Sequence, residues 1–275
     1  MQPDTPSQTG QPAPSVLVFD SGVGGLSVAG EIRKLLPGLR LIYAADYAFL
    51  PYGEKTEAQL IERVPRLLAA LEARFAPKIV VIACNTASTV VLPATRAALQ
   101  AEVVGTVPAI KPAAALTQTK VIGLLGTPGT VRRTYTQHLI DDFASDCQVL
   151  RHGSVELVGL AEAKLRGEKP SQAAVEAAIA PLYAQPGGGD VDVVVLACTH
   201  FPLLAEELAA ASAPKVRLID SGAAIARRVK TLLGVQSLPG PAPAGPAILT
   251  PGADIGALKP AFAAYGFDEI EILDV

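Results

Sequence analysis

The chain has 275 residues, of which 50% are hydrophobic and 18% are charged, and its formal net charge is −3. This length favours one large or two medium-sized domains with a substantial core. No basic stripe and no long apolar run occurs in the sequence, which argues against nucleic acid and a membrane as partners. Three cysteines in a chain of this size favour free thiols in a reducing cytoplasm over a disulfide scaffold.

The chain begins with a polar stretch, residues 1–14, that lacks the basic start and apolar centre of a secretory signal; we expect a disordered tail. Short runs rich in Val, Ile and Leu then alternate with stretches rich in Ala, Leu, Glu and Arg. The predicted strands end, in chain order, at Asp20, at Asp46, just before Cys84, at Gly126, just before Cys198, at Asp220 and just before Asp274. The predicted helices cover residues 26–36, 57–73, 87–100, 171–183 and 223–233. Continuous apolar strands between amphipathic helices are typical of parallel sheets that helices cover on both faces.

Two pairs of similar segments indicate an internal repeat. VLVFDSGVGGLSV resembles VIGLLGTPGTV, and ACNTAS around Cys84 resembles ACTHFP around Cys198. Chance similarity between parallel strands is the alternative explanation. A true repeat predicts an α/β protein of two pseudo-symmetric, doubly wound parallel-sheet domains with the active site between them. The first domain would comprise residues 15–108 plus 218–275, with a last strand and helix from the C-terminal stretch, and the second would comprise residues 109–217.

Cys84 and Cys198 each follow a predicted strand directly, where parallel α/β proteins place reactive groups. A thiol with a pKa of ~8.5 is only a few per cent thiolate at neutral pH, and a helix N-terminus lowers that pKa. Because Cys84 precedes a predicted helix, we expect its pKa to be lowered. A buried structural cysteine is the alternative for either residue alone, but the matching pair suits moving a proton between the two faces of a carbon. Cys147 has no comparable setting and is interpreted as a packing residue.

His200 lies two residues after Cys198, where its imidazole could exchange a proton with a thiol or an amine; a packing or capping histidine is the alternative. The sequence has no further ligand pair with zinc spacing, so no metal site is predicted. The turn DSGVGGLS starts at Asp20, whose carboxylate could orient an ammonium or a thiol. Its glycines would let backbone N–H groups approach a ligand, although a simple turn is the alternative. The turn matches neither common nucleotide-binding glycine motif.

Three further loops carry polar groups that could bind carboxylates, although each could also be a plain loop. One is PYGEK, and the others follow Cys84 and the strand that ends at Gly126. Their candidate residues are Pro51, Tyr52, Gly53, Asn85, Thr86, Thr127 and Thr130.

The segments FDSGVGG, PYGEK, ACNTAS, GTPGTV and ACTHFPLL, in this order and spacing, closely resemble the glutamate racemases of the aspartate/glutamate racemase superfamily. The resemblance implies a cofactor-independent racemase of two α/β domains, and a homodimer. It implies that Cys84 and Cys198 are the acid/base thiols, that Asp20 assists Cys84 and that His200 assists Cys198. The positions that match substrate contacts are Ser21, Tyr52, Gly53, Asn85, Thr86 and Thr199.

One segment departs from the family pattern. The family usually has a site glutamate in a stretch that reads roughly L-V-E-x-G-L, near a Cys-Pro pair. This chain has GSVELVGLAEAKL instead, in which Glu162 fits the position best and Glu156 is the rival.

The leading hypothesis is interconversion of L- and D-glutamate by two thiols, with D-glutamate supplied to peptidoglycan precursors as the resemblance implies. No pyridoxal is expected, because no lysine stands at a strand end beside the thiols. A racemase of another acidic amino acid, chiefly aspartate, is one alternative. An amino-acid-binding protein without turnover is the other, but it would need the loops and not two thiols.

Overall fold

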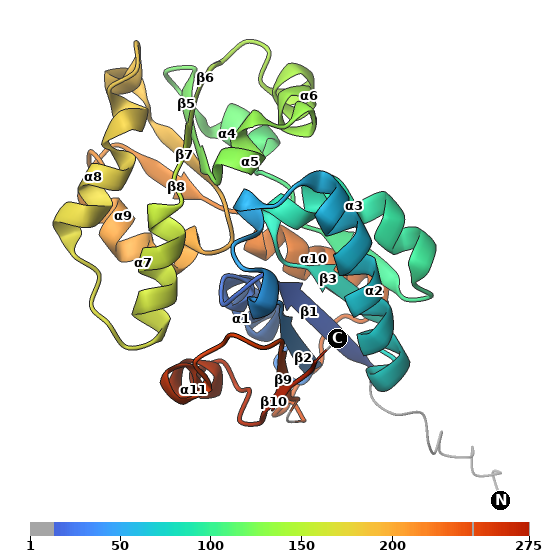
Figure 1. Ribbon diagram of the computed structural model, residues 1–275. Helices are drawn as coiled ribbons and strands as arrows, with labels where there is room; N and C mark the ends of the chain where they lie inside the picture. The colour runs from blue at the N-terminus through green and yellow to red at the C-terminus, as the bar shows by residue number, and fades with distance from the viewer. Residues whose placement is uncertain (1–13, 244, 275) are drawn as a thin grey trace, which may run out of the picture.

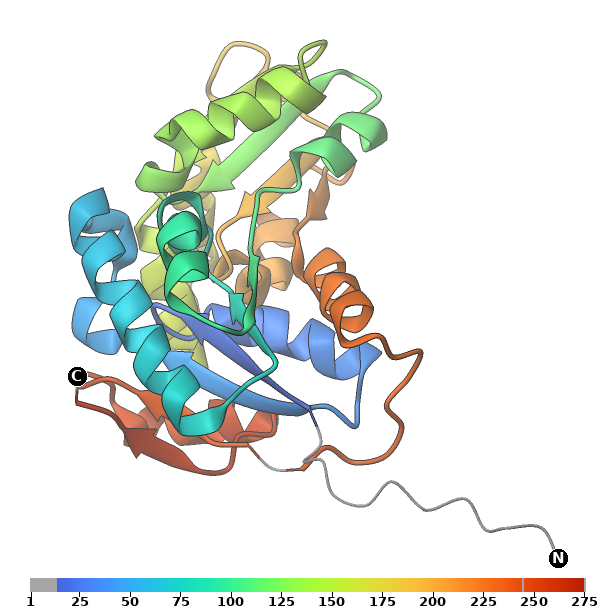
Figure 2. The same cartoon turned by 90° about the vertical axis from the view of Figure 1, so that its right-hand side faces the viewer.

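A computed structural model describes residues 14–243 and 245–274. The predicted tail, residues 1–14, lies outside the described residues except for Pro14. The described chain forms two parallel sheets, one of six strands and one of four, each between layers of helices (Figures 1 and 2). This arrangement confirms the predicted α/β class with two parallel-sheet domains. None of the helices in the described ranges is long and apolar enough to cross a membrane.

The larger sheet carries the first domain. Its strand order is β10-β9-β2-β1-β3-β4, and all pairs are parallel. The strands are β1 (Ser15–Asp20), β2 (Arg40–Ala45), β3 (Ile79–Ile82), β4 (Glu102–Gly105), β9 (Ala247–Leu249) and β10 (Ile270–Ile272). Helices α1 (Gly25–Leu35), α10 (Gly222–Leu233) and α11 (Ile255–Ala264) cover one face. Helices α2 (Glu57–Phe75) and α3 (Asn85–Ala98) cover the other.

The smaller sheet has the order β6-β5-β7-β8 and is also parallel. Its strands are β5 (Val121–Gly126), β6 (Gln148–Gly153), β7 (Val193–Ala197) and β8 (Arg217–Ile219). Helices α7 (Glu156–Leu165), α8 (Gln172–Tyr183) and α9 (Ala205–Ala211) pack on one face. The other face is covered by α4 (Ile110–Leu116), α5 (Pro128–Arg132) and α6 (Thr134–Phe143). Short 3₁₀ turns are η1 (Tyr47–Phe49), η2 (Tyr52–Glu54), η3 (Gly188–Asp190) and η4 (Phe201–Leu204).

The two sheets share one topology. The strands β2-β1-β3-β4 and β6-β5-β7-β8 have the same order, in which the first strand in sequence lies between the second and the third. Such an order has a switch point at the carboxyl ends of the first and third strands, where open α/β sheets bind ligands. Cys84 follows β3 and Cys198 follows β7, so each thiol lies at the equivalent switch point of its own sheet. The shared order supports the interpretation of the sequence as a repeat.

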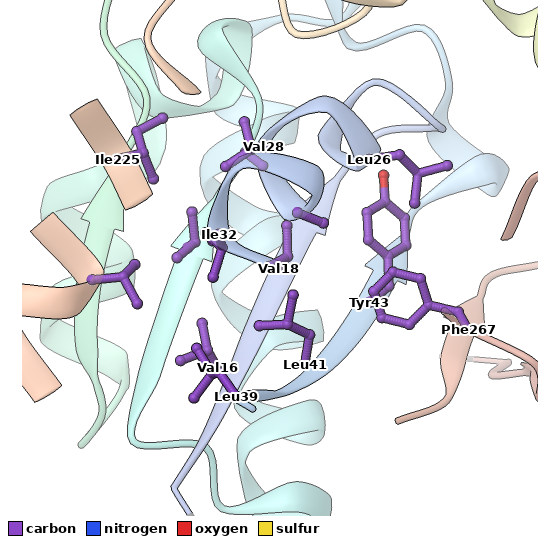
Figure 3. Close-up of a cluster of buried hydrophobic side chains, with 14 of the residues drawn as sticks. Val16, Val18, Leu26, Val28, Ile32, Leu39, Leu41, Tyr43, Ile225 and Phe267 are labelled. Carbon is purple, nitrogen blue, oxygen red and sulfur yellow. The ribbon is translucent and has the colours of Figure 1, made fainter. Parts of the chain in front are cut away.

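Strand periodicity explains how the core of the first domain divides. Successive side chains of a strand point to opposite faces. In β1, Val16 and Val18 pack under α1, whereas Leu17 and Phe19 pack under α2 and α3. Figure 3 shows the cluster of buried side chains between the sheet and the helices α1, α10 and α11, with Ile225 of α10 next to Val28 of α1. All residues of β1 are buried because helices cover both faces, which is why its sequence is apolar without alternation.

One strand lies in a different sheet from the one expected. β8 pairs with β7, so residues 218 and 219, which the prediction assigned to the first domain, belong to the second sheet. The chain returns to the first domain at α10, which packs against α1. The sequence of a short parallel strand does not reveal its neighbour, because pairing depends on where the preceding helix returns the chain. The other domain boundaries stay a prediction, whereas the expected C-terminal addition to the first sheet is present as β9, α11 and β10.

Candidate active site

The two switch points face one cavity, which brings both candidate thiols to a common space. The cavity has a volume of about 20 Å³, which is room for about one water molecule. Its lining residues are Ser21, Leu50, Pro51, Tyr52, Gly53, Glu54, Cys84, Asn85, Thr86, Thr127, Val155, Val158, Cys198, Thr199 and His200. All of the predicted site residues except Asp20, Thr130 and Glu162 are in this lining, and those three are buried behind it.

Cys84 is the residue that precedes α3, and its side chain is buried. Burial raises the pKa of Cys84 well above its ordinary value, and the neighbouring Asp20 carboxylate raises it further. The N–H of Ala87 in the first turn of α3 acts in the expected direction and lowers the pKa, but it is the smaller effect. The expectation of a lowered pKa for Cys84 is therefore wrong, because desolvation outweighs the helix N-terminus.

Asp20 ends β1 and is wholly buried beside Cys84. Its Oδ2 accepts the N–H of Gly25 at 2.8 Å, which fixes the carboxylate at the start of α1. Burial raises the pKa of Asp20, although the charge of His200 opposes the effect. A buried carboxyl with a raised pKa can exchange a proton with a thiol near neutral pH more readily than an ordinary aspartate.

Cys198 belongs to a chain of polar contacts. His200 places Nδ1 at 3.9 Å from the Cys198 sulfur, and its Nε2 lies 2.9 Å from Oε1 of Glu162. Burial alone would lower the pKa of His200, but Cys198, Glu162 and Asp20 together raise it well above its ordinary value. Burial would raise the pKa of Glu162, but the hydrogen bond and charge of His200, together with the hydrogen bonds from Val23 and Tyr47, more than offset it, so that pKa is lowered. The raised pKa of His200 and the lowered pKa of Glu162 both favour a protonated imidazole beside an ionised carboxylate.

The structure places the two rival glutamates in different surroundings. Glu162 is buried, and its carboxylate contacts His200. Glu156 is exposed at the start of the same helix and accepts a hydrogen bond from Ser154. Only Glu162 can act on the thiol chain through His200.

Side chains occupy the space beside two glycines of the Gly-rich turn. A Cβ at Gly22 would lie 2.2 Å from Oε1 of Glu162, and one at Gly24 would lie 2.4 Å from Nδ1 of His200. Gly22 therefore leaves space for Glu162 of the second domain, and Gly24 leaves space for His200 of the second domain and for Asp20 of its own, whose Oδ2 would lie 2.8 Å from the added Cβ. Close approach of a ligand to the same backbone is not required to explain these two residues.

Hydroxyl and amide groups line the cavity from both domains. Thr86 of α3 lies within 3.0 Å of the Thr127 hydroxyl and 3.3 Å of the Thr130 hydroxyl, across the domain boundary. Asn85 Nδ2 is buried and has no hydrogen-bond partner among the described residues, so it offers a donor to a ligand. The hydroxyl of Tyr52, in contrast, donates to Asp46 at 2.8 Å. Tyr52 therefore faces a ligand with its main chain or ring edge rather than its hydroxyl.

Sequence reasoning missed several residues around the cavity. Val155 and Val158 form an apolar wall, and Tyr47 and Val23 contact Glu162. The two valines lie in the GSVELVGL segment, in which the sequence motifs indicate only Glu156 as a candidate. One helical turn separates them, so their side chains share a face of α7. Tyr47 carried no signal, because its partner is more than a hundred residues away in the chain.

Comparisons with known proteins give the family. The sequence pattern of the Asp/Glu/Hydantoin racemase family matches residues 26–229. A glutamate racemase of Sphingopyxis alaskensis is 51% identical over 267 residues, covering 94% of this chain and 98% of the relative. One from Escherichia coli is 51% identical over 276 residues, covering 98% and 94%. This chain belongs to the glutamate racemases.

A solved structure supports the assignment. The crystal structure of Escherichia coli glutamate racemase, in complex with L-glutamate and the activator UDP-MurNAc-Ala, superposes with a TM-score of 0.89 at 50% identity. The match covers 96% of this chain and 99% of that chain. The comparisons confirm the family that the motifs indicated, and they favour glutamate over aspartate and over a binding protein without turnover.

Proposed function

We propose that this racemase interconverts L- and D-glutamate without a cofactor and that Cys84 and Cys198 each serve one face of the α-carbon. The observation that supports the proposal most strongly is that both thiols line one cavity from equivalent positions of two sheets with the same strand order. A proton removed on one side can then be replaced from the other, which inverts the carbon.

In each direction one sulfur takes the α-proton as the C–H bond breaks, and the other thiol transfers its proton to the opposite face of the carbon. The resemblance to the family assigns D-glutamate to Cys84 and L-glutamate to Cys198. Burial disfavours the thiolate of Cys84, and a substrate ammonium group beside the sulfur would favour it. Asp20 next to Cys84 and His200 next to Cys198 are the groups that exchange protons with the sulfurs.

The carboxylates of glutamate need donors in a site that excludes water. Asn85 Nδ2, the hydroxyls of Ser21, Thr86, Thr127 and Thr130, and the loops at Pro51–Gly53 and Thr199 supply them in this proposal. Donors fixed before substrate binds stabilise the carbanion-like transition state without reorganising in it.

The biological setting is part of the same proposal. We assign the protein to the cytoplasm, where three unpaired cysteines would stay reduced, and to the supply of D-glutamate for peptidoglycan precursors. A homodimer follows from the family resemblance, and light scattering of the purified protein tests it.

The mechanism is tested by polarimetry of pure D-glutamate with protein that has been dialysed against a chelator. Loss of optical rotation is expected, and aspartate in parallel should react far more slowly. Cys84→Ser and Cys198→Ser should each lower kcat/KM by at least about 10²–10⁴-fold, the usual contribution of an acid/base group.

Cys147→Ser is the matched control, because Cys147 is partly exposed and contacts Asp146 away from the cavity. Its activity should equal that of the parent. Full activity in either of the other two mutants, or recovery of a dialysed enzyme only on addition of metal or pyridoxal phosphate, would overturn the mechanism.

A further inference from the structure

The carboxylate of Glu162 is held by donors from both domains. Oε1 accepts from His200 Nε2 at 2.9 Å and from the N–H of Val23 at 2.9 Å. Oε2 accepts from the hydroxyl of Tyr47 at 3.0 Å, with Arg166 at 3.9 Å. Glu162 and His200 belong to the second domain, whereas Val23 and Tyr47 belong to the first, so the carboxylate has its full set of partners only when the domains are together (Figure 1).

Tyr47 is itself fixed by its neighbours. The preceding residue, Asp46, is wholly buried and accepts two hydrogen bonds from Arg63, at 2.7 Å each. Asp46 also accepts from Tyr52 and Thr250, at 2.8 and 2.9 Å. This network anchors the segment of residues 46–52, which carries Tyr47 at one end and the cavity-lining Tyr52 at the other.

From these contacts we infer that Tyr47 is a positioning residue for the Cys198 side of the reaction: its hydroxyl holds Glu162 where Glu162 orients His200. The inference rests on the proposed function, in which His200 serves Cys198. On the Cys84 side, the hydrogen bonds that hold Asp20 among the described residues come from Ser21 and Gly25 of its own domain, and His200 acts on Asp20 through its charge alone. Tyr47 therefore acts on one of the two proton transfers. Because Tyr47 and Glu162 belong to different domains, the orientation of His200 also depends on the contact between the two domains.

The charges around the hydroxyl are consistent with a donor role. Burial, followed by the charge and hydrogen bond of Glu162, raises the pKa of Tyr47 well above its ordinary value. The tyrosine thus remains protonated and can only donate to the carboxylate, with Arg166 and Asp20 as the other charged groups nearby.

Tyr47→Phe removes the hydroxyl and keeps the ring. A hydrogen bond to a charged group is worth about ten- to a hundredfold in an equilibrium constant, so kcat/KM should fall by about that factor, equally in both directions because the equilibrium constant is fixed. With α-deuterated substrates, the primary isotope effect should rise for one enantiomer only, the one that Cys198 deprotonates. The isotope effect does not depend on the amount of folded enzyme, so partial unfolding of the variant leaves this result readable.

A double-mutant cycle shows whether Tyr47 acts through Glu162. In the Glu162→Gln background, Tyr47→Phe should change kcat/KM by less than about twofold, because coupled residues are not additive. Tyr183→Phe is the control, since it removes a hydroxyl that contacts Ser212 far from the cavity, and its kinetics should match the parent. Parent-like kinetics of Tyr47→Phe, additive effects in the cycle, or isotope effects that rise equally for both enantiomers would each overturn the inference. An inactive wild-type protein in the same assay would instead refute the proposed function.

Discussion

Cys84 and Cys198 occupy equivalent positions in two sheets, but their neighbours are different. Cys84 has the carboxyl of Asp20 beside it, and Cys198 has the imidazole of His200. Both pairs can move a proton: transfer between a thiol and a carboxylate moves a negative charge from one group to the other, whereas transfer between a thiol and an imidazole forms or neutralises an ion pair. At the residue scale, the repeated architecture therefore produces an asymmetric site.

This asymmetry predicts different isotope effects in two variants. With α-deuterated substrates, Asp20→Asn should raise the primary isotope effect more for D-glutamate, because the Cys84 step becomes more rate-limiting. His200→Asn should do the same for L-glutamate. The ratio of the two kcat/KM values cannot change, since thermodynamics fixes it. Equal increases for both enantiomers in both variants would mean that each residue serves the whole site.

The contact between His200 and Glu162 predicts a stability that depends on pH. The pKa of His200 is raised, so its contribution is complete below the unfolded histidine pKa of ~6.5 and is lost as the pH rises through the folded value. The pKa of Glu162 is lowered, so its contribution is complete above the unfolded pKa of ~4.3 and is lost as the pH falls through the folded value. Both contributions are complete together only between about pH 5 and pH 6.5.

Glu162→Gln should therefore destabilise the protein most in that window, by on the order of 3 kcal/mol, as expected for loss of one partner from a buried pair. Urea unfolding at a series of pH values measures the difference between wild type and variant. The difference should shrink at higher pH as His200 loses its proton. Asp20, which also faces His200, is unchanged in the variant and does not contribute to the comparison. A difference that is constant with pH would contradict the assigned charges.

At the element scale, the Gly-rich turn and α1 support the neighbouring domain as well as their own. The turn leaves space for His200 and Glu162, and Ser27 of α1 donates to the Thr199 carbonyl at 2.9 Å. The backbone of the turn at Gly24 has right-handed helical angles, which an alanine also adopts. The constraint on this position comes from the side chains of His200, in the second domain, and of Asp20, in the first.

Gly24→Ala should accordingly impair the reaction more than the fold. The new methyl group must displace His200, and a misplacement of about 1 Å can lower a catalytic rate about 10²-fold. The free energy of unfolding should fall by about 1–3 kcal/mol from overpacking. Kinetics and urea unfolding measure both changes. Gly159→Ala in α7 is the matched control: beyond its own helix backbone, no atom lies within 4 Å of the place its methyl group would take, so activity should be unchanged and stability should rise by roughly 0.5–1 kcal/mol.

At the scale of the whole molecule, the cavity is smaller than the substrate it is proposed to bind. With room for about one water molecule, the cavity must enlarge to admit an amino acid. A wider spacing between the two domains that line it would enlarge it. The two segments that connect the domains are joined where Ser221 donates to the Val107 carbonyl. Arg133 of the second domain also forms an ion pair with Glu57 of the first, so this pair links the two domains.

Arg133→Gln should weaken this contact and favour the open form. Glu57 is 67% exposed, and such a pair is worth about 0.2–1 kcal/mol, so KM for both enantiomers should rise by up to about fivefold while kcat changes less. Salt screens exposed charges. The ratio of KM between variant and wild type should therefore approach one at high ionic strength. Steady-state kinetics at low and high salt test this, and a variant that lowers kcat with an unchanged KM would exclude a role in closure.

The features that depend on local chemistry could be predicted from the amino-acid sequence alone. Apolar runs and helical periodicity placed the strands that end at Asp20 and before Cys84 and Cys198, because every strand between two helical layers must be apolar on both faces. The repeat in the motifs predicted two related units, which the equal strand orders support. The prediction missed β4, β6 and β9. Arg151 and His152 interrupt the apolar run of β6, and β4 and β9 contain only two and three consecutive apolar residues. Length alone was not decisive, because β8 and β10 are also three residues long and were predicted.

The features that depend on contacts between distant residues became visible in the folded structure. The sign of the pKa shift of Cys84 follows from burial, which a helix N-terminus in the sequence cannot reveal. The choice between Glu162 and Glu156 follows from which face of α7 meets the first domain. β8 joined the second sheet because of where α9 returned the chain. In each case the deciding contact is between segments that are separated in the sequence, and a local sequence pattern does not predict such contacts.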